Sequence, residues 1–251
     1  MKPDIKNVVA VVPARLGSNR IKAKNLRLLN GHPLISYVLK YLKQTKYFQN
    51  IYINSDSELF KPIAIEVGVQ FYQRPPELAT SESLIDDYIY NFIKNAGPDY
   101  LAVVNPTSPF IGSDQLDRAW EQYCKSDCDT QLSCERIQTH CFYQNQPINF
   151  SIDEKHPRSQ DLTPVLALNF AITIWNAKRF TEQYERFGHG VYTGKLGFFE
   201  TEGYASVDID YEEDFAFAEL VARFVEQRSS FSACYPDYVE TYFREHGDTR
   251  N

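Results

Sequence analysis

The stretch VVAVVPARLGSNRIKAKNL, residues 8–26, decides the fold. Its first part is an apolar, β-branched run that ends at Pro13, which is typical of a strand buried on both faces of a parallel sheet. The part that follows holds four cations within ten residues: Arg15, Arg20, Lys22 and Lys24. In α/β proteins, the loop between a strand and a helix is a place where phosphate groups bind. The stretch therefore raises the question of which anion it binds.

The rest of the first half alternates strand and helix patterns. Strands are predicted over 7–13, 50–56, 69–75 and 99–106, and helices over 32–48, 57–68, 83–97 and 113–126. Pro33 is expected in the first turn of its helix, and Ser113 as an N-cap. This order predicts an α/β fold with a doubly wound, mostly parallel sheet. Ligands in such sheets bind beyond the carboxyl ends of the strands, where the loops 13–31, 73–82 and 105–112 lie.

The pattern changes after Thr130. Strands are predicted over 130–137, 166–176 and 204–210, and a helix over 211–228, whereas 138–166 shows no clear periodicity. No linker or repeat divides the chain. We therefore predict one domain over residues 1–251, with residues 134–170 as a small projecting insertion.

Composition limits the classes of function. The chain has 251 residues, a net charge of −7 and a pI of about 5.3, which disfavours a nucleic-acid-binding role. No apolar run reaches the roughly 18 residues that span a bilayer, and no signal peptide is recognised, so we expect a cytoplasmic protein without membrane contact. Five cysteines are present: Cys124, Cys128, Cys134, Cys141 and Cys234. Their spacing matches no zinc motif, so ordinary thiols are favoured over a structural zinc site.

The cationic loop lacks both glycine-rich phosphate motifs, G-x-G-x-x-G and G-x-x-x-x-G-K-[ST]. Side chains must supply the positive charge instead. Arg15 offers a forked guanidinium and Lys24 a mobile point charge, while Gly17 and Ser18 let the backbone approach an anion closely. The alternative is a run of charges that simply faces water.

An acidic counterpart lies in VDID, residues 207–210. In an extended segment, Asp208 and Asp210 would point to the same side, with their Cα atoms roughly 6.5–7 Å apart. Two such carboxylates can share Mg²⁺, which keeps water and substrate phosphate oxygens as its other ligands. The alternative is that they are acids at a helix N-terminus, which explains Glu213 and Asp214 well.

Five segments, in order, resemble one known family. PARLGSNRIKAKNL is similar to the signature of the acylneuraminate cytidylyltransferases, the CMP-sialic acid synthetases and their relatives. It matches at Pro13, Ala14, Arg15, Gly17, Ser18, Lys24 and Asn25. INSDSELFKPIAIEVGVQFYQRPPELA, VVNPTSPF, RSQDLTPVLALNFAITI and VDIDYEEDF resemble the family's later motifs. The five segments span about 200 residues.

The resemblance implies a Rossmann-like nucleotidyltransferase that transfers CMP from CTP to the anomeric hydroxyl of a sialic-acid-like 2-keto-3-deoxy sugar acid, releasing pyrophosphate. Catalytic roles are implied for Arg15, Lys24, Asp208 and Asp210, the two aspartates holding Mg²⁺. Nucleotide contacts are implied for Ala14, Arg15, Gly17, Ser18, Arg20, Lys24, Asn25, Arg74 and Ser83, the last in the turn 79–83. Sugar contacts are implied for Asn105, Thr107, Arg158, Gln160 and Asn169. A homodimer formed through the insertion is implied as well.

Three departures concern the substrate. Asn19 stands where the family has a cation, which Arg20 would then supply. Asn105 replaces Gln, and Phe170 replaces Gly in a motif near the sugar, where it would narrow the pocket. These changes favour an acid other than N-acetylneuraminate, such as legionaminic, pseudaminic or a Kdo-like acid, or else indicate weak activity.

Alternatives remain open at this point. Arg74 could cap a strand end, Arg158 could be a surface residue, and Asn169 could satisfy a backbone group. The protein could be a CMP-Kdo-type synthetase or another cytidylyltransferase. A glycosyltransferase with a D-x-D motif and an inactive binding homologue are further rivals.

Overall fold

A computed structural model describes residues 7–18, 20–227, 236, 239, 241, 244 and 245. Asn19 and Cys234, both singled out above, lie outside the described residues. At the centre is a seven-stranded sheet in the order β11-β7-β10-β6-β1-β4-β5. Its strands are β1 Val8–Pro13, β4 Asn50–Ser55, β5 Gln70–Gln73, β6 Tyr100–Val104, β7 Thr130–Ile137, β10 Val165–Asn176 and β11 Leu196–Glu200. Only β10 runs antiparallel to its neighbours, so the predicted mostly parallel sheet is confirmed.

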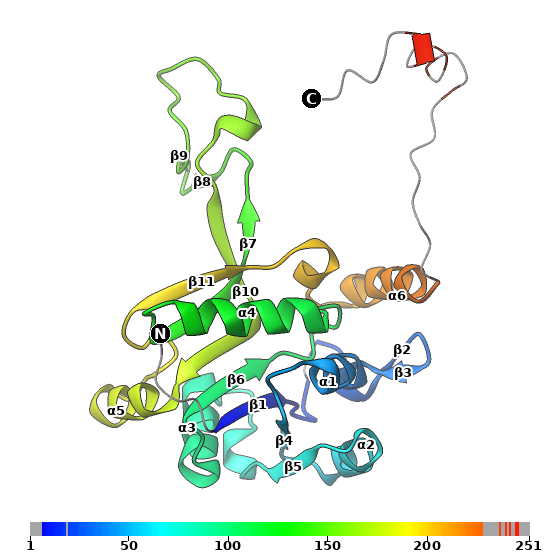
Figure 1. Cartoon of the computed structure of the whole chain (residues 1–251), viewed down its shortest axis with the longest axis vertical. Helices are drawn as coiled ribbons and strands as arrows, with labels where there is room; N and C mark the ends of the chain where they lie inside the picture. The colour runs from blue at the N-terminus through cyan, green and yellow to red at the C-terminus, as the bar shows by residue number, and fades with distance from the viewer. Residues whose placement is uncertain are drawn as a thin grey trace.

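Helices cover both faces of this sheet (Figure 1). On β1, Ala10 and Val12 belong to the core shared with α1 Leu34–Gln44, α2 Lys61–Val67 and α4 Ser113–Lys125. The alternate residues Val9 and Val11 belong to the core beneath α3 Ile85–Ala96 and α5 Ala177–Phe187. The unbroken apolar run is therefore buried on both faces, and the doubly wound arrangement is confirmed.

A third hydrophobic core joins the first loop to the segment that carries Asp208 and Asp210. Ile21 of the first loop and Leu29 of β2 Leu28–Leu29 pack with Phe215 of α6 Glu212–Glu226. Ile209, which lies between the two predicted metal-binding aspartates, is fully buried in the same cluster. The short strand β3 His32–Pro33 pairs with β2 beside this cluster. This core holds the segment 208–210 against the cationic loop.

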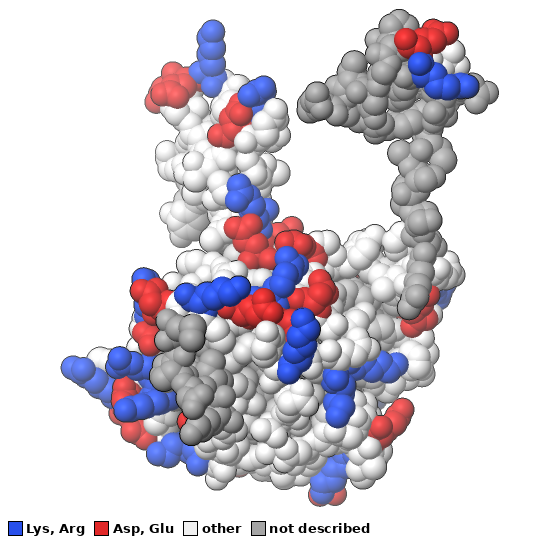
Figure 2. Space-filling view, viewed as in Figure 1, with Lys and Arg blue, Asp and Glu red and all other residues white. Residues whose placement is uncertain are grey.

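The ends of β7 and β10 leave the main body and continue into an arm that projects from it (Figure 1). The arm carries the two-residue strands β8 Phe142–Tyr143 and β9 Gln146–Pro147, followed by the 3-10 turn η4 Ser159–Asp161. Its exposed side chains include Phe142, Tyr143, Ile148 and Ile152. Figure 2 shows that most of the visible arm is neither acidic nor basic.

Three local predictions were wrong. The strand expected over 204–210 is instead the 3-10 turn η5 Gly203–Ser206 followed by an irregular segment, and the late strand is β11. The N-cap of α4 is Gly112, with no side-chain cap, and Ser113 is its first residue. Pro33 lies in β3, immediately before α1, because its φ of −52° and ψ of 135° are extended.

Candidate active site

A cavity of about 520 Å³ lies at the carboxyl ends of β1, β5 and β6. The chain goes from β1 to β4 and β5 on one side and then to β6 on the other, which makes this the switch point where doubly wound sheets bind ligands. We call the cavity the cationic recess. Its lining includes Arg15, Ser18, Arg20, Lys24, Asn25, Arg74 and Ser83, all predicted nucleotide contacts. Of the other two predicted contacts, Ala14 is fully buried and Gly17 is not among the lining residues.

The first loop is tied to the turn 79–83. Arg15 Nη1 donates to the Thr80 carbonyl oxygen at 2.7 Å. The Thr80 amide in turn donates to Ser83 Oγ at 3.0 Å, and Ser83 Oγ donates to the Glu77 carbonyl oxygen at 3.1 Å. Leu16 N also donates to Asp56 Oδ1, at the end of β4. The walls of the recess are therefore connected to one another through Arg15.

Arg74 is a buried cation in the wall of the recess. Its Nε donates to Asn54 Oδ1 at 2.8 Å, and its Nη2 donates to the Asn54 carbonyl oxygen at 2.9 Å. The guanidinium lies 4.1 Å from the centre of the Tyr88 ring. Burial lowers the pKa of Arg74 and raises the pKa of Tyr88 to about 12. Arg74 thus hydrogen-bonds to Asn54 in β4, which agrees with the alternative that it caps a strand end. It also lines the recess.

The predicted metal-binding residues separate into two environments. Asp210 lies between two cations, with Oδ2 2.9 Å from Arg20 Nη1 and Oδ1 3.3 Å from Lys24 Nζ. Lys24 Nζ also donates to the Ile209 carbonyl oxygen. Asp208 lines the same cavity wall as Thr107, whose carbonyl oxygen accepts from the Ile209 amide at 2.9 Å. Although part of the Asp208 side chain meets solvent, desolvation by the surrounding protein raises its pKa.

Two carboxylates suit a magnesium ion that takes its other ligands from water and substrate phosphates. Among the described residues, no group of three or more His, Cys, Asp or Glu side chains could hold a metal ion by itself. The two residues supply carboxylate oxygens, the type of ligand that Mg²⁺ prefers. Asp208 and Asp210 therefore fit a shared Mg²⁺. For this, one carboxylate oxygen of Asp210 would leave Arg20 or Lys24 and bind the ion.

A second cavity, of about 410 Å³, adjoins the recess and shares Tyr88, Asn105 and Thr107 with it. We call it the adjoining cavity. The predicted sugar contacts Asn105, Thr107 and Asn169 line it, together with Asp208. The structure does not bring Arg158 and Gln160 to either of these two cavities. Gln160 lies in η4 of the arm and Arg158 immediately before it, where Arg158 is exposed and its Nε is 2.7 Å from Asp161 Oδ2.

Phe170 has an unusual backbone. Its φ is +53°, a left-handed conformation that favours glycine, and it lies where the register between β7 and β10 shifts. Asn105 Nδ2 donates to its carbonyl oxygen at 2.8 Å, which holds the irregular strand against the end of β6. A non-glycine residue in this conformation costs roughly 1–2 kcal/mol. Phe170 also lines the adjoining cavity, as the predicted narrowing requires.

Asn169 is largely occupied within the protein. Its Oδ1 accepts from Ser133 Oγ at 2.7 Å, and its Nδ2 donates to Thr201 Oγ1 at 2.7 Å. The Ala171 amide also donates to its Oδ1 at 3.2 Å, which agrees with the alternative that Asn169 satisfies a backbone group.

Several lining residues escaped the sequence analysis. They are Tyr88, Asp86, Val191 and Tyr192. Asp86 and Tyr88 lie in the first turns of an amphipathic helix, where an acid is already explained by the helix dipole. Val191 and Tyr192 follow α5 in a segment without periodicity, so no pattern in the sequence marked them.

Comparison with known proteins identifies the class. The fold is similar to that of the solved CMP:2-keto-3-deoxy-manno-octonic acid synthetase complexed with CTP, with a TM-score of 0.67, 15% identity, and coverage of 89% of this chain and 100% of that one. The chain has the Rossmann-like nucleotidyltransferase fold. A family model described as cytidylyltransferase matches residues 9–233. The chain belongs to the cytidylyltransferase family.

Two curated relatives are each 28% identical to the chain over the aligned residues. The N-acylneuraminate cytidylyltransferase of Streptococcus agalactiae serotype V is 28% identical over 86% of this chain and 52% of its own length. The pseudaminic acid cytidylyltransferase of Campylobacter jejuni serotype O:2 is 28% identical over 90% of this chain and 100% of its own length. The chain thus spans about half the length of the first of these relatives and all of the second.

Proposed function

We propose that the protein transfers CMP from CTP to the anomeric hydroxyl of a sialic-acid-like 2-keto-3-deoxy sugar acid and releases pyrophosphate. One observation carries this proposal: the cationic recess adjoins a second cavity that Asp208 lines, while Asp210 pairs with Arg20 and Lys24 of the recess. A triphosphate needs the cations, and a transfer reaction needs two substrates side by side. The relatives named for sialic and pseudaminic acids support this acceptor class.

The recess suits the nucleotide. Arg15, Arg20 and Lys24 would bind the triphosphate, with Ser18 nearby. Asn25 lines the recess, and its Oδ1 has no hydrogen-bond donor within the described chain, so a turn of the side chain toward the recess would let it accept a bond from the exocyclic amino group of a cytosine. Arg74 and the turn 79–83 would enclose the base and ribose.

The junction of the two cavities suits the chemistry. The α-phosphorus would lie near Thr107, with the acceptor hydroxyl entering from the adjoining cavity and pyrophosphate leaving along the first loop. Asp208 and Asp210 would hold Mg²⁺, which supplies charge neutralisation at the α-phosphate. Lys24, fixed by the Ile209 carbonyl and Asp210, would stabilise negative charge that develops on the transferring phosphate. Catalysis would then consist mainly of positioning and electrostatic stabilisation.

The arm suits contact between two subunits. Its exposed Phe142, Tyr143, Ile148 and Ile152 form an apolar surface that a second copy could cover. We propose that Arg158 and Gln160 contact the sugar acid across such a dimer, since they do not line the adjoining cavity of their own chain. No helix in the described part of the chain is long and apolar enough to cross a membrane. We propose a cytoplasmic homodimer.

A CMP-Kdo-type synthetase is the second candidate, favoured by the similarity of the fold to a synthetase of that class. The test is pyrophosphate release from CTP and Mg²⁺ with a panel of nine-carbon and eight-carbon 2-keto-3-deoxy acids, compared with ATP, GTP and UTP. We expect CTP-dependent release with a nine-carbon acid. Turnover only with the eight-carbon acid would support the second candidate. No CTP binding and no release with any acid would overturn both.

A further inference from the structure

Helix α6 is apolar on two sides. Its inner side, which includes Phe215 and Val221, is buried in the third hydrophobic core. On the outer side, Phe217, Leu220 and Phe224 follow one another at spacings of three and four residues, so they form one line along the helix. Leu220 is 64% exposed and Phe217 is 53% exposed, while Phe224 is half-buried. We call these three residues the outer stripe.

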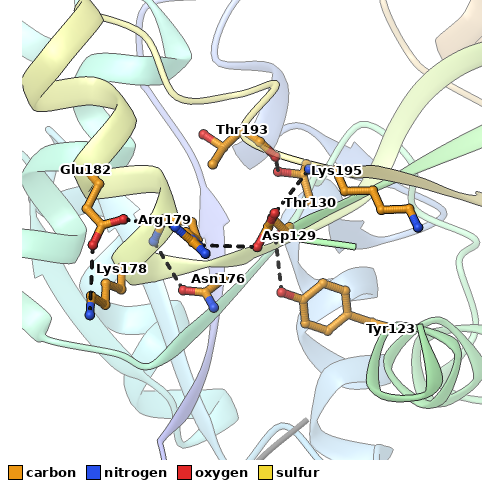
Figure 3. A network of polar contacts seen from close by, with 9 residues as sticks. All are labelled: Tyr123, Asp129, Thr130, Asn176, Lys178, Arg179, Glu182, Thr193 and Lys195. Carbon is orange, nitrogen blue, oxygen red and sulfur yellow. Dashed lines mark hydrogen bonds and ion pairs between the residues drawn. The ribbon is translucent and has the colours of Figure 1, made fainter. Parts of the chain in front are cut away.

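Helix α5 provides a contrast, because its outer side presents charges to water. Lys178 Nζ lies 3.9 Å from Glu182 Oε1 (Figure 3). Arg179 Nε lies 3.7 Å from Asp129 Oδ1 in the same network. Charged side chains of this kind are what the solvent-facing side of an amphipathic helix usually carries. The outer stripe of α6 has large apolar side chains instead, which is typical of a surface that another element covers.

Two neighbouring segments widen the outer stripe. Leu28 of β2 is exposed and lines, together with Leu220, a groove of about 400 Å³ between the β2–β3 hairpin and α6. Next to Phe224, the exposed Tyr204 of η5 meets the Phe224 ring edge-on, with the ring centroids 6.1 Å apart. The apolar surface therefore extends from β2 across α6 to η5. A surface of this length suits an occupant that is itself a helix with one apolar side.

The chain continues past α6 with a segment of this kind. Residues 236–245, which we call the C-terminal segment, have the sequence PDYVETYFRE. On a helix, its apolar residues would share one side that spans about 140°, and its polar residues beyond Asp237 would take the other side. The apolar residues are Tyr238, Val239, Tyr242 and Phe243. Beyond Pro236, those residues of the segment that the structure describes are helical.

The connection is long enough to bring the C-terminal segment back to the outer stripe. Residues 228–235 join Gln227 to Pro236, and a chain of this length can span up to about 30 Å. Helix α6 has 15 residues and is therefore about 22 Å long. A helix as short as the C-terminal segment is marginal in water, and it becomes stable mainly by packing its apolar side against a partner.

We propose that the C-terminal segment docks on the outer stripe of its own chain as an amphipathic helix. In the structure, the described residues of the segment stand apart from α6, so docking is a second, closed arrangement of the chain (Figure 1). Closure removes two apolar surfaces from water at once. Because α6 begins two residues after Asp210, closure also braces the helix that holds the acidic segment against the first loop. This proposal concerns the packing of α6 and holds whatever the cationic recess binds.

Hydrogen exchange read by mass spectrometry tests the docking in the full chain. The amides of residues 238–245 should exchange at least about tenfold more slowly than those of an unstructured chain. Leu220→Asp alters only the outer stripe and Phe243→Asp only the segment, and each should restore unstructured exchange rates. Ile65→Asp, at an 81% exposed position on α2, is the matched control and should leave the slow exchange unchanged. Unstructured rates in the unaltered protein, slow exchange that persists in either stripe or segment variant, or loss of it in the control would overturn the proposal.

Co-expression of the two variants decides which chain supplies the segment. The Leu220→Asp chain keeps an intact segment, and the Phe243→Asp chain keeps an intact outer stripe. If docking occurs within one chain, neither chain can restore it, and the intact segment should exchange at unstructured rates in the mixture. Slow exchange of that segment only in the mixture would assign the outer stripe to the segment of a second copy and would overturn docking within the chain.

Discussion

Arg20 Nη1 lies 2.9 Å from Asp210 Oδ2, so a cation of the first loop pairs with a carboxylate that precedes α6. Arg20 also lies 5.1 Å from the centre of the Tyr211 ring, and hydrogen bonding to Tyr211 followed by the charge of Asp210 raises its pKa. Lys24 approaches the other oxygen of the same carboxylate. Cationic and acidic parts of the site are therefore one ionic cluster, which binding of the proposed metal–triphosphate would rearrange.

Arg20→Gln should weaken CTP binding about tenfold or more, because a charge-assisted bond to phosphate is worth about 1.5–3 kcal/mol. The measurement is CTP titration in the presence of Mg²⁺. Lys22→Gln is the matched control, since Lys22 is a cation of the same loop that does not line the recess. Equal affinities of the two variants would remove Arg20 from the nucleotide site.

Asp210→Asn should lower kcat by at least about a thousandfold, on the scale of removing a main electrostatic contribution to a transition state. The variant should fold, because Asn fills the same volume as Asp and the backbone amide of residue 210 still donates to Asp214 Oδ2. Glu212→Gln, which breaks an exposed pair with Arg27, is the control and should retain most of the activity. Pyrophosphate release over a range of Mg²⁺ concentrations decides the matter, and an active Asp210→Asn enzyme would refute the metal role.

Asp208→Asn should make the protein without ligands more stable at neutral pH. Desolvation raises the pKa of Asp208 in the folded state, so ionisation opposes folding once the pH exceeds the unfolded value. The gain should disappear at a pH low enough to protonate Asp208 in both states. Thermal unfolding of both proteins across this pH range tests the prediction. An identical Tm at pH 7 would contradict it.

Phe170→Gly should be more stable than Phe170→Ala, by about 1 kcal/mol. Both variants lose the same ring, but only glycine adopts a φ of +53° without strain. At a position with ordinary backbone geometry, alanine would be the more stable of the two. Denaturant unfolding of the two variants measures the difference. A more stable Phe170→Ala would show that the left-handed conformation is not strained.

The sheet could be predicted because its signal is local. An apolar run such as 8–13 and the helical spacing in 83–97 specify burial without knowledge of the rest of the chain. β11 was missed because its sequence, LGFFE, is short and contains a glycine, and it becomes a strand only by pairing with β7.

The site was predictable in part for the same reason. The structure brings Arg15, Lys24 and Arg74 to one recess because their loops follow β1 and β5, parallel strands of one sheet with only β4 between them. Asp86 and Val191 could not be predicted as lining residues, because the contact between them joins α3 to a segment without any hydrophobic periodicity. The ion pair between Asp210 and Arg20 could not be predicted from the sequence either, because it depends on how α6 packs on the first loop.

Phosphorus NMR of the reaction products tests the central claim most directly. Incubation of the protein with CTP, Mg²⁺ and the nine-carbon sugar acids should yield pyrophosphate and a new phosphodiester resonance, in which the α-phosphorus of CTP is joined to the anomeric oxygen of the acid. If the protein is folded and the CTP resonances remain unchanged with every acid tested, the result would contradict the account.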